Sequence, residues 1–215
     1  MNFNTKRLTT TAMMLAAATV LALLCAYIPF LNLPFGGGFT IASMLPVVVI
    51  AYMYGTGWGL FSGFVYGLIQ LLLGHSTVMA LFTPGTDDFQ GIGAAILICL
   101  IDYVLAYTAL GLGGVFRSRA KTKARALIFG VILALGVRYL CHIVSGCVFY
   151  GMWAEWFFGQ EGLPLGGWVL DTFSGFGLSF LYSVVYNGLF MIPEIVITAL
   201  AAIPAARIRY IKKEC

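Results

Sequence analysis

The sequence predicts an all-α integral membrane protein with six transmembrane helices in one compact bundle and both termini in the cytoplasm. Hydrophobic residues make up 61% of the 215 residues, charged residues only 9%, and the mean hydropathy is +0.97. Soluble domains carry about 25% charged residues. The apolar residues gather into runs of the length that crosses a bilayer, and no linker, low-complexity tract or repeat divides residues 1–215. We therefore expect a single membrane domain.

Six hydrophobic segments define the expected helices. They span residues 8–28, 41–54, 57–73, 91–116, 126–150 and 175–206. Pro29 closes the first, and Pro34 with Gly36–Gly38 prevents a helix from continuing into the second. The second is short for a spanning helix and carries Pro46, so it could be a half-helix packed inside the bundle. The last contains Pro193, where we expect a kink.

The distribution of charge predicts the orientation in the membrane. All basic residues except Arg138 lie before the first segment, between the fourth and fifth, or after the sixth. Six crossings place these three groups on one side. The charged residues of the opposite loops are all acidic: Asp87, Asp88, Glu155, Glu161 and Asp171. The positive-inside rule then predicts a multi-pass plasma-membrane protein with cytoplasmic N- and C-termini. Five hydrophobic segments after the first argue that the start is retained rather than cleaved as a signal peptide.

Arg138 and His142 are polar residues within the fifth apolar segment, and their spacing of four places them on one helical face. An arginine at the middle of a membrane costs at least ~2.5–3.5 kcal/mol, so it should face protein, water or a ligand rather than lipid. Intramembrane ionisable residues usually mark functional sites. A structural arginine that pins two helices together is the alternative.

Asp102 interrupts the fourth segment at about the depth of Arg138. At ~1.5 Å per residue, both lie roughly 20 Å above the cytoplasmic ends of neighbouring antiparallel helices. An Asp102–Arg138 ion pair is therefore plausible. Asp102 could also hold a cationic or amide-bearing ligand while Arg138 completes the pocket, and the two interpretations are compatible. Glu194 lies at a similar depth, where it could pair with Arg138 or lie in water.

Aromatic residues gather in the outer halves of the same helices: Tyr66, Tyr103, Tyr139, Tyr150, Trp153, Tyr182 and Tyr186. Rings around a carboxylate suit a flat or cationic organic ligand, through stacking and cation–π attraction. For Trp153, Trp156 and Trp168, an interfacial aromatic belt is the better interpretation. Asn187, beside Tyr186, could read ring nitrogens of a ligand or bond across helices.

Several chemical classes are excluded by missing motifs. The chain has no Walker loop, no GxSxG and no GxGxxG in a strand–helix setting, so it cannot hydrolyse ATP by itself. Its two histidines lack the carboxylate spacing of a zinc site, and HExxH is absent. We expect no enzyme activity, no cofactor, no metal and no nucleic-acid partner. Ala12 and Ala16 give a small-xxx-small spacing that would let a partner helix approach closely.

Four stretches carry a family resemblance: YGLIQLLLGH at 66–75, DYVLAY at 102–107, RYLCHIVSGCVFY at 138–150 and YSVVYNGLFMIPE at 182–194. In this order they resemble the thiamine-specific substrate-binding (S) component of energy-coupling factor (ECF) transporters. The resemblance implies a six-helix membrane protein that captures thiamine from outside. It also implies a transmembrane coupling subunit and two cytoplasmic ATPase subunits as partners.

The resemblance also implies site residues, which fall on Asp102, Tyr103, Arg138, Tyr139, His142, Tyr150, Tyr182, Asn187, Tyr66 and His75. The family's AxxxA docking motif falls on Ala12 and Ala16. Arg138 replaces the usual lysine, which differs in shape and hydrogen-bond geometry. No ligand role transfers to the loop before the second helix, where the family's Trp and Glu meet Gly36–Gly38 and Ile41.

Two other functions remain open from the residues alone. A carrier acting without partners could use Asp102, Arg138 and Glu194 as a proton relay. An S component for another small organic vitamin or precursor would use the same kind of pocket. An intramembrane enzyme would need a nucleophile and base, or a metal set, at one depth, and only His142 with loosely placed hydroxyls is available.

Overall fold

The computed structural model describes residues 3–33 and 38–213. Within them every regular element is helical. Five helical stretches are long and apolar enough to cross a membrane: Asn4–Ala26 within α1 (Phe3–Ala26), α3 (Thr56–Leu73), Ile92–Gly114, α7 (Lys123–Phe149) and α10 (Gly175–Ala205). The apolar helix α2 (Leu45–Tyr54) is shorter. The all-helical membrane class is thereby confirmed, and most boundaries lie within a few residues of those predicted.

The start of the second helix was predicted too early. Residues 41–44 form turns, Ala42 has a positive φ of 60°, and α2 begins at Leu45. Pro46 explains the boundary, since a proline fits the first turn of a helix, where its missing N–H is not needed. Pro193 lies inside α10, which continues past it, and the kink expected there stays a prediction. Pro34, Gly36 and Gly37 lie outside the described residues.

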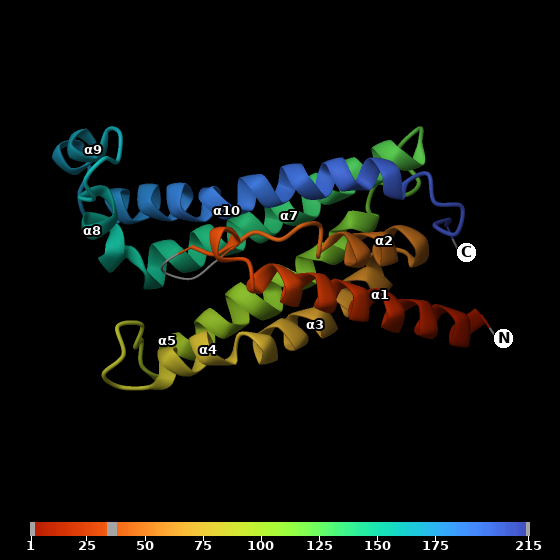
Figure 1. Ribbon diagram of the computed structural model, residues 1–215, viewed down its shortest axis with the longest axis horizontal. Helices are drawn as coiled ribbons and strands as arrows, with labels where there is room; N and C mark the ends of the chain where they lie inside the picture. The colour runs from red at the N-terminus through yellow and green to blue at the C-terminus, as the bar shows by residue number, and fades with distance from the viewer. Residues whose placement is uncertain (1–2, 34–37, 214–215) are drawn as a thin grey trace.

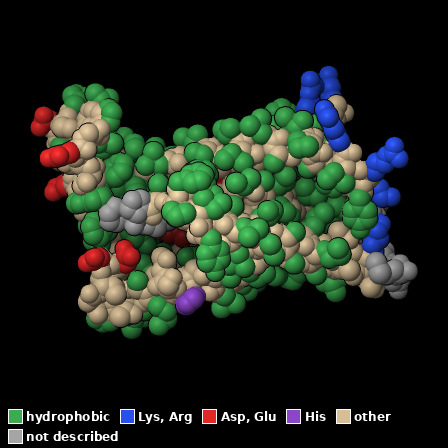
Figure 2. Space-filling view, in the orientation of Figure 1, with side chains coloured by type: hydrophobic (Ala, Val, Ile, Leu, Met, Phe, Trp, Pro, Cys, Tyr) green, Lys and Arg blue, Asp and Glu red, His purple; other side chains and the backbone are tan. Residues whose placement is uncertain are grey.

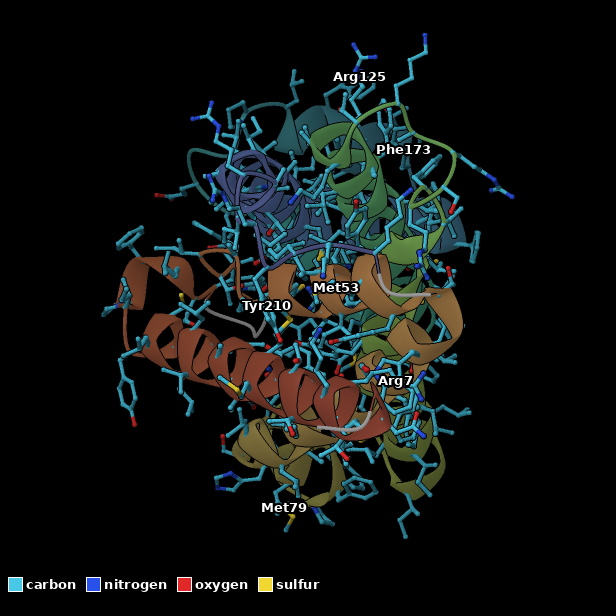
Figure 3. All side chains as sticks on the ribbon, turned by 90° about the vertical axis from the view of Figure 1, so that its right-hand side faces the viewer. Arg7, Met53, Met79, Arg125, Phe173 and Tyr210 are labelled. Atoms are coloured by element: carbon cyan, nitrogen blue, oxygen red, sulfur yellow. The ribbon has the colours of Figure 1, made fainter. Side chains whose placement is uncertain are left out.

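The helices run along one axis and bring both termini to the same end of the molecule (Figure 1). α7 and α10 lie side by side over most of their length and form the most extensive helix pair. The opposite end carries three short helices that the hydrophobic pattern did not predict: α4 (His75–Phe82), α8 (Ala154–Phe158) and α9 (Gly166–Thr172). Viewed along the bundle, Met53 of α2 lies among the helices, whereas Met79 of α4 points outward (Figure 3).

Charge separates along this axis. The space-filling view shows Lys and Arg side chains at the end that carries the termini and Asp and Glu side chains at the other (Figure 2). Apolar side chains cover most of the surface between them. The C-terminal segment closes the basic end, because Lys123 Nζ donates to the carbonyls of Ile208 and Ile211 at 2.8 and 2.7 Å. The Tyr210 hydroxyl meets that of Thr10 at 2.8 Å.

Glycines let α3 approach the helical stretch that carries Asp102. A Cβ built on Gly63 would lie 2.5 Å from the carbonyl oxygen of Tyr107, and one on Gly111 would lie 2.1 Å from the backbone nitrogen of Leu60. Those distances are far inside normal contact, so only glycine permits this approach. The packing fixes the position of Asp102 relative to the rest of the bundle.

Candidate ligand-binding site

A cavity of about 570 Å³ opens among the helices toward the acidic end. Its volume falls in the range of small-molecule pockets, about 300–1,000 Å³. Seven of the predicted ligand residues line it: Asp102, Tyr103, Arg138, His142, Tyr150, Tyr182 and Asn187. They come from two antiparallel spanning stretches and from α10, so a single chamber collects side chains that are far apart in sequence.

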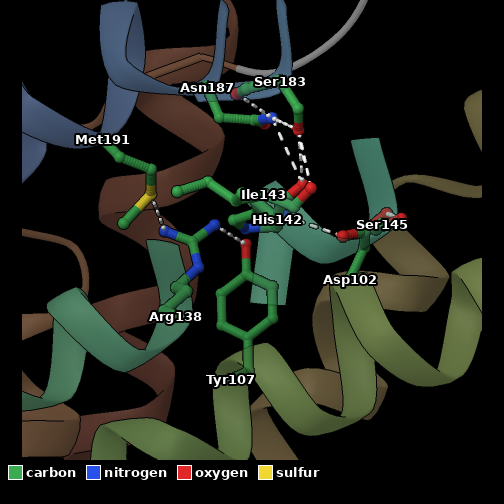
Figure 4. A network of polar contacts seen from close by, with 9 residues as sticks. All are labelled: Asp102, Tyr107, Arg138, His142, Ile143, Ser145, Ser183, Asn187 and Met191. Atoms are coloured by element: carbon green, nitrogen blue, oxygen red, sulfur yellow. Dashed lines mark hydrogen bonds and ion pairs between the residues drawn. The ribbon is translucent and has the colours of Figure 1, made fainter. Parts of the chain in front are cut away.

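Asp102 is held by two side chains of α7 (Figure 4). Its Oδ1 lies 2.8 Å from His142 Nδ1, and its Oδ2 accepts a 2.6 Å hydrogen bond from the Ser145 hydroxyl. Because an ionised carboxylate only accepts, the proton of a neutral imidazole must lie on Nδ1. His142 Nε2 is then an acceptor, and among the described residues this buried atom has no partner. Asp102 and His142 together offer acceptors to a ligand.

The backbone around Asp102 widens into a π-helical segment, Cys99–Leu105, inside the spanning stretch. A π-helix bonds residue i to i+5, and such segments frequently occur at functional sites. The wider turn carries Asp102 and Tyr107, five residues apart, to the same cavity. A regular α-helical period does not put these two side chains on one face, which is why Tyr107 was missed in the sequence.

Arg138 does not pair with Asp102, contrary to the ion pair considered from depth alone. Its Nη1 contacts the thioether sulfur of Met44 at 3.0 Å. Nη1 also contacts the Met191 sulfur at 3.5 Å, and Nη2 donates to the Tyr107 hydroxyl at 3.2 Å (Figure 4). The guanidinium also lies 4.5 Å from the centroid of the Tyr107 ring. Asp102 already has hydrogen-bond partners in His142 and Ser145. The contacts with the two methionines and with Tyr107 hold Arg138 against the Tyr107 ring instead.

Arg138 is therefore a buried cation that forms no ion pair with any described carboxylate. Its side chain is 5% exposed, and no carboxylate among the described residues lies within ion-pair distance. Its Nε has no hydrogen-bond partner in the described part of the chain. Sulfur and phenol are weak acceptors, so the guanidinium retains capacity for a ligand acceptor.

Hydrogen bonds fasten α10 to α7 beside this cluster. Asn187 Nδ2 donates to the His142 carbonyl at 3.2 Å and to the Ser183 carbonyl at 2.8 Å. The Ser183 hydroxyl donates to the Ile143 carbonyl at 2.7 Å (Figure 4). The amide of Asn187 therefore bonds across helices, as one of its two interpretations expected, and it lines the cavity as well, while contact with a ligand stays a prediction.

Three predicted ligand residues are not brought to the cavity. The Tyr139 hydroxyl donates to the Val184 carbonyl at 2.6 Å, which joins α7 to α10. Tyr66 is completely buried, donates to the Ala18 carbonyl at 3.2 Å, and packs edge-on to Tyr107 with ring centroids 5.4 Å apart. His75 is exposed at the start of α4. The position of a residue in the sequence indicates on which face of its helix it lies, but not which neighbouring group contacts its side chain.

The aromatic wall differs in part from the one predicted. Tyr182 and Tyr186 lie 5.5 Å apart between ring centroids, and both line the cavity. Trp153 lines it too, so the interfacial-belt interpretation is corrected for this residue. Trp153 lies in a short 3₁₀ turn that folds back after α7, and its helical phase could not be read from the sequence. Asp87 and Asp88, in the loop after α4, complete the wall.

Comparison with known proteins decides the family. Residues 8–160 match the model of the thiamine transporter protein family. The chain belongs to the thiamine transporter protein family. It is 31% identical over 204 residues to the thiamine transporter ThiT of Bacillus subtilis, covering 90% of this chain and 86% of that protein. It is 28% identical over 123 residues to ThiT of Lacticaseibacillus paracasei, covering 52% and 54% of the two chains.

The fold of the family is also found here. A solved structure of ThiT from Listeria monocytogenes aligns with a TM-score of 0.62 at 23% identity, over 96% of both chains. This likeness shows the shared fold. Family membership confirms the resemblance stated from the four sequence stretches. It places the chain among thiamine transport proteins rather than enzymes.

Proposed function

We propose that the cavity binds thiamine and that the chain is the substrate-binding component of an ECF-type transporter. The observation that carries this proposal is the carboxylate of Asp102, placed in the wall of a ligand-sized cavity within an apolar bundle. Thiamine has a permanent thiazolium cation and an aminopyrimidine that donates and accepts hydrogen bonds. Charge-assisted contacts with a carboxylate are strong where water is scarce.

The geometry suggests a role for each group. Asp102 offers its charge to the cation, and His142 Nε2 offers an acceptor to the exocyclic amine. Arg138 offers donors to ring nitrogens. The rings that line the cavity supply faces and edges for stacking, from Tyr103, Tyr150 and Tyr182. Asn187 adds an amide on the α10 side.

We propose six crossings, with α2 as the short sixth member, and cytoplasmic termini at the basic end. The segregation of Lys and Arg to that end supports this orientation. The cavity then opens outward, where thiamine is captured. In a cysteine-free background, Thr122→Cys should react with a membrane-impermeant maleimide only from the cytoplasm, and Gln160→Cys only from outside. Labelling of both from one face would contradict the orientation.

The proposed partners are a transmembrane coupling subunit and two cytoplasmic ATPase subunits, in addition to membrane lipid. Ala12 and Ala16 are exposed on α1, as a docking face requires. Met13, between them in sequence, is 68% exposed, so the face of α1 that carries these three residues is not covered by the described chain. Small residues there would let a partner helix approach closely.

The decisive experiment is titration of tryptophan fluorescence by thiamine in detergent. Wild-type protein should show saturable quenching, and Asp102→Asn should weaken binding at least tenfold, about 1.4 kcal/mol. Asp171→Asn is the matched control, because Asp171 is an exposed acid of α9 outside the cavity wall. Equal affinity of Asp102→Asn and wild type, with the fold intact, would contradict the assigned site.

A further inference from the structure

Among the described residues, Glu194 is the one residue of α10 that hydrogen-bonds to the segment between α1 and α2. Its carboxylate accepts from the backbone N–H of Thr40, and both of its oxygens accept from the Thr40 hydroxyl at 2.9 Å. The Ser43 hydroxyl lies 2.6 Å from that of Thr40. The backbone N–H and the hydroxyl of Thr40 thus both donate to the carboxylate of Glu194, which lies 154 residues further along the chain.

Glu194 is 0% exposed. Its remaining described partner is the hydroxyl of Thr198 on its own helix, at 3.2 Å. Among the described residues, Thr40 is therefore its one hydrogen-bond partner outside α10. A buried carboxylate costs several kcal/mol unless hydrogen bonds compensate it. The hydrogen bonds from Thr40 compensate this carboxylate, and the positive charge of Arg138, which lies beyond ion-pair distance, favours it as well.

The tied segment is part of the cavity wall. Gly38, two residues before Thr40, lines the cavity, as does Phe190, one turn before Glu194 on α10. At the other end of the segment, the Met44 sulfur accepts from Arg138 Nη1 at 3.0 Å, and Arg138 lines the cavity as well. Gly38–Met44 is therefore held at two points, by a carboxylate and by a guanidinium.

We infer that Glu194 is a positioning residue for the ligand site, acting through Thr40 to hold Gly38–Met44 as a wall of the cavity. The inference rests on the proposed function for its ligand. Glu194 itself does not line the cavity, so its effect on binding must pass through the segment that it holds. Loss of the carboxylate should release the wall and shorten the residence of the ligand.

A native thiol reports on this segment independently of any ligand. The backbone N–H of Ile41 donates to Cys25 Sγ at 3.3 Å, and Cys25 is 5% exposed. If the segment leaves α10, this thiol becomes accessible to maleimide. Replacing Cys99, Cys141, Cys147 and Cys215 by alanine leaves Cys25 as the single reporter.

The test compares Glu194→Leu with the control Thr198→Val, which removes a hydrogen bond to the same carboxylate without touching the segment. Glu194→Leu should raise the rate of Cys25 labelling and the rate of thiamine dissociation at least tenfold each. Thr198→Val should leave both within twofold of wild type. Glu194→Gln, which keeps an acceptor for the Thr40 N–H, should recover most of the loss. Wild-type rates in a folded Glu194→Leu protein would overturn the inference, as would faster labelling with unchanged dissociation.

A second variant covers failure of Glu194→Leu to fold. Thr40→Val removes the hydroxyl and keeps the backbone donor, so labelling and dissociation should each rise about fivefold. Unchanged rates in Thr40→Val would also overturn the inference. Failure of the wild type to bind thiamine would refute the proposed function alone, because the Cys25 measurement requires no ligand.

Discussion

The two ends of the bundle are built from the same helices and packed in opposite ways. At the basic end, backbones touch through glycine, α2 is almost wholly buried, and the C-terminal segment covers the helices. At the acidic end, the helices surround a cavity of about 570 Å³. The stretch Ile92–Gly114 illustrates the contrast, since its π-helical part faces the cavity and its 3₁₀ part, Ala109–Gly114, is packed against α2 and α3.

This comparison shows how an apolar chain can bind a polar ligand and remain stable. Small residues at one end supply close packing, which anchors the helices. Polar residues at the other end are held by hydrogen bonds on their protein side, which leaves Asp102, His142 and Arg138 oriented toward the cavity. Each end can therefore be changed separately, and the following variants test that independence.

The largest effect should come from the exposed face of α1. Replacing both Ala12 and Ala16 by Trp should abolish transport and assembly with the coupling subunit, because the bulky rings prevent close helix contact. Thiamine affinity of the isolated subunit should stay within twofold of wild type, since these residues lie far from the cavity wall. Co-purification and fluorescence titration measure the two quantities. Joint loss of assembly and binding would indicate misfolding and break the comparison.

The next effect concerns the glycine packing between α3 and the helical stretch that carries Asp102 and Tyr107. Gly63→Ala should lower the free energy of unfolding by about 2 kcal/mol, because its Cβ would lie 2.5 Å from the Tyr107 carbonyl oxygen. Gly57→Ala, on the same helix with nothing within 4 Å of its Cβ, is the matched control. It should be neutral or stabilising by up to about 1 kcal/mol. Thermal melts in detergent distinguish the two, and equal melting temperatures would contradict the packing argument.

Arg138 tests whether the acidic end is built for the ligand rather than for stability. Arg138→Met should weaken thiamine binding about tenfold, or 1.4 kcal/mol. The melting temperature of the empty protein should be unchanged or raised, because a buried cation with no carboxylate within ion-pair distance is replaced by an apolar side chain. Arg138→Lys should retain part of the affinity. A lower melting temperature for empty Arg138→Met would instead assign Arg138 a structural role.

The smallest effect is expected at Ser145. Ser145→Ala removes one of the two hydrogen bonds that orient Asp102 and leaves the contact with His142. Binding should weaken about fivefold, consistent with roughly 1 kcal/mol for one hydrogen bond. Ser179→Ala, whose exposed hydroxyl bonds to its own helix at Gly175, should leave binding unchanged. Isothermal titration of the two variants makes the comparison direct.

Hydropathy was enough to predict an all-helical membrane protein. The long apolar runs set the helix boundaries within a few residues, and the position of Pro46 explains the exception at α2. The site was predicted in part, because polar residues inside membrane helices are costly enough to mark a function. The contacts of Arg138 could not be predicted, since depth alone favoured Asp102 as its partner. The hydrogen bonds of Asp102 with His142 and Ser145 are evident only from the structure.

The remaining errors have local causes. Tyr107 was missed because the π-helical segment changes the period of the helix, and no residue type in Cys99–Leu105 predicts that change. Trp153 was misinterpreted because the chain after α7 turns back through 3₁₀ and short α-helical pieces. Tyr66 and Tyr139 were predicted as ligand residues but do not line the cavity, and their hydroxyls donate to carbonyl groups of neighbouring helices.

The ionisable groups in the interior also bear on how membrane voltage acts on the protein. Asp102 and Glu194 supply two carboxyl groups and Arg138 one guanidinium, so with both carboxyl groups ionised the middle of the described helices carries a formal excess of one negative charge. A monocation in the cavity cancels that excess. Displacing one elementary charge through the membrane field requires about 2.3 kcal/mol per 100 mV. The loaded interior could therefore move with little electrical work, whereas movement of the empty interior would be sensitive to the membrane potential.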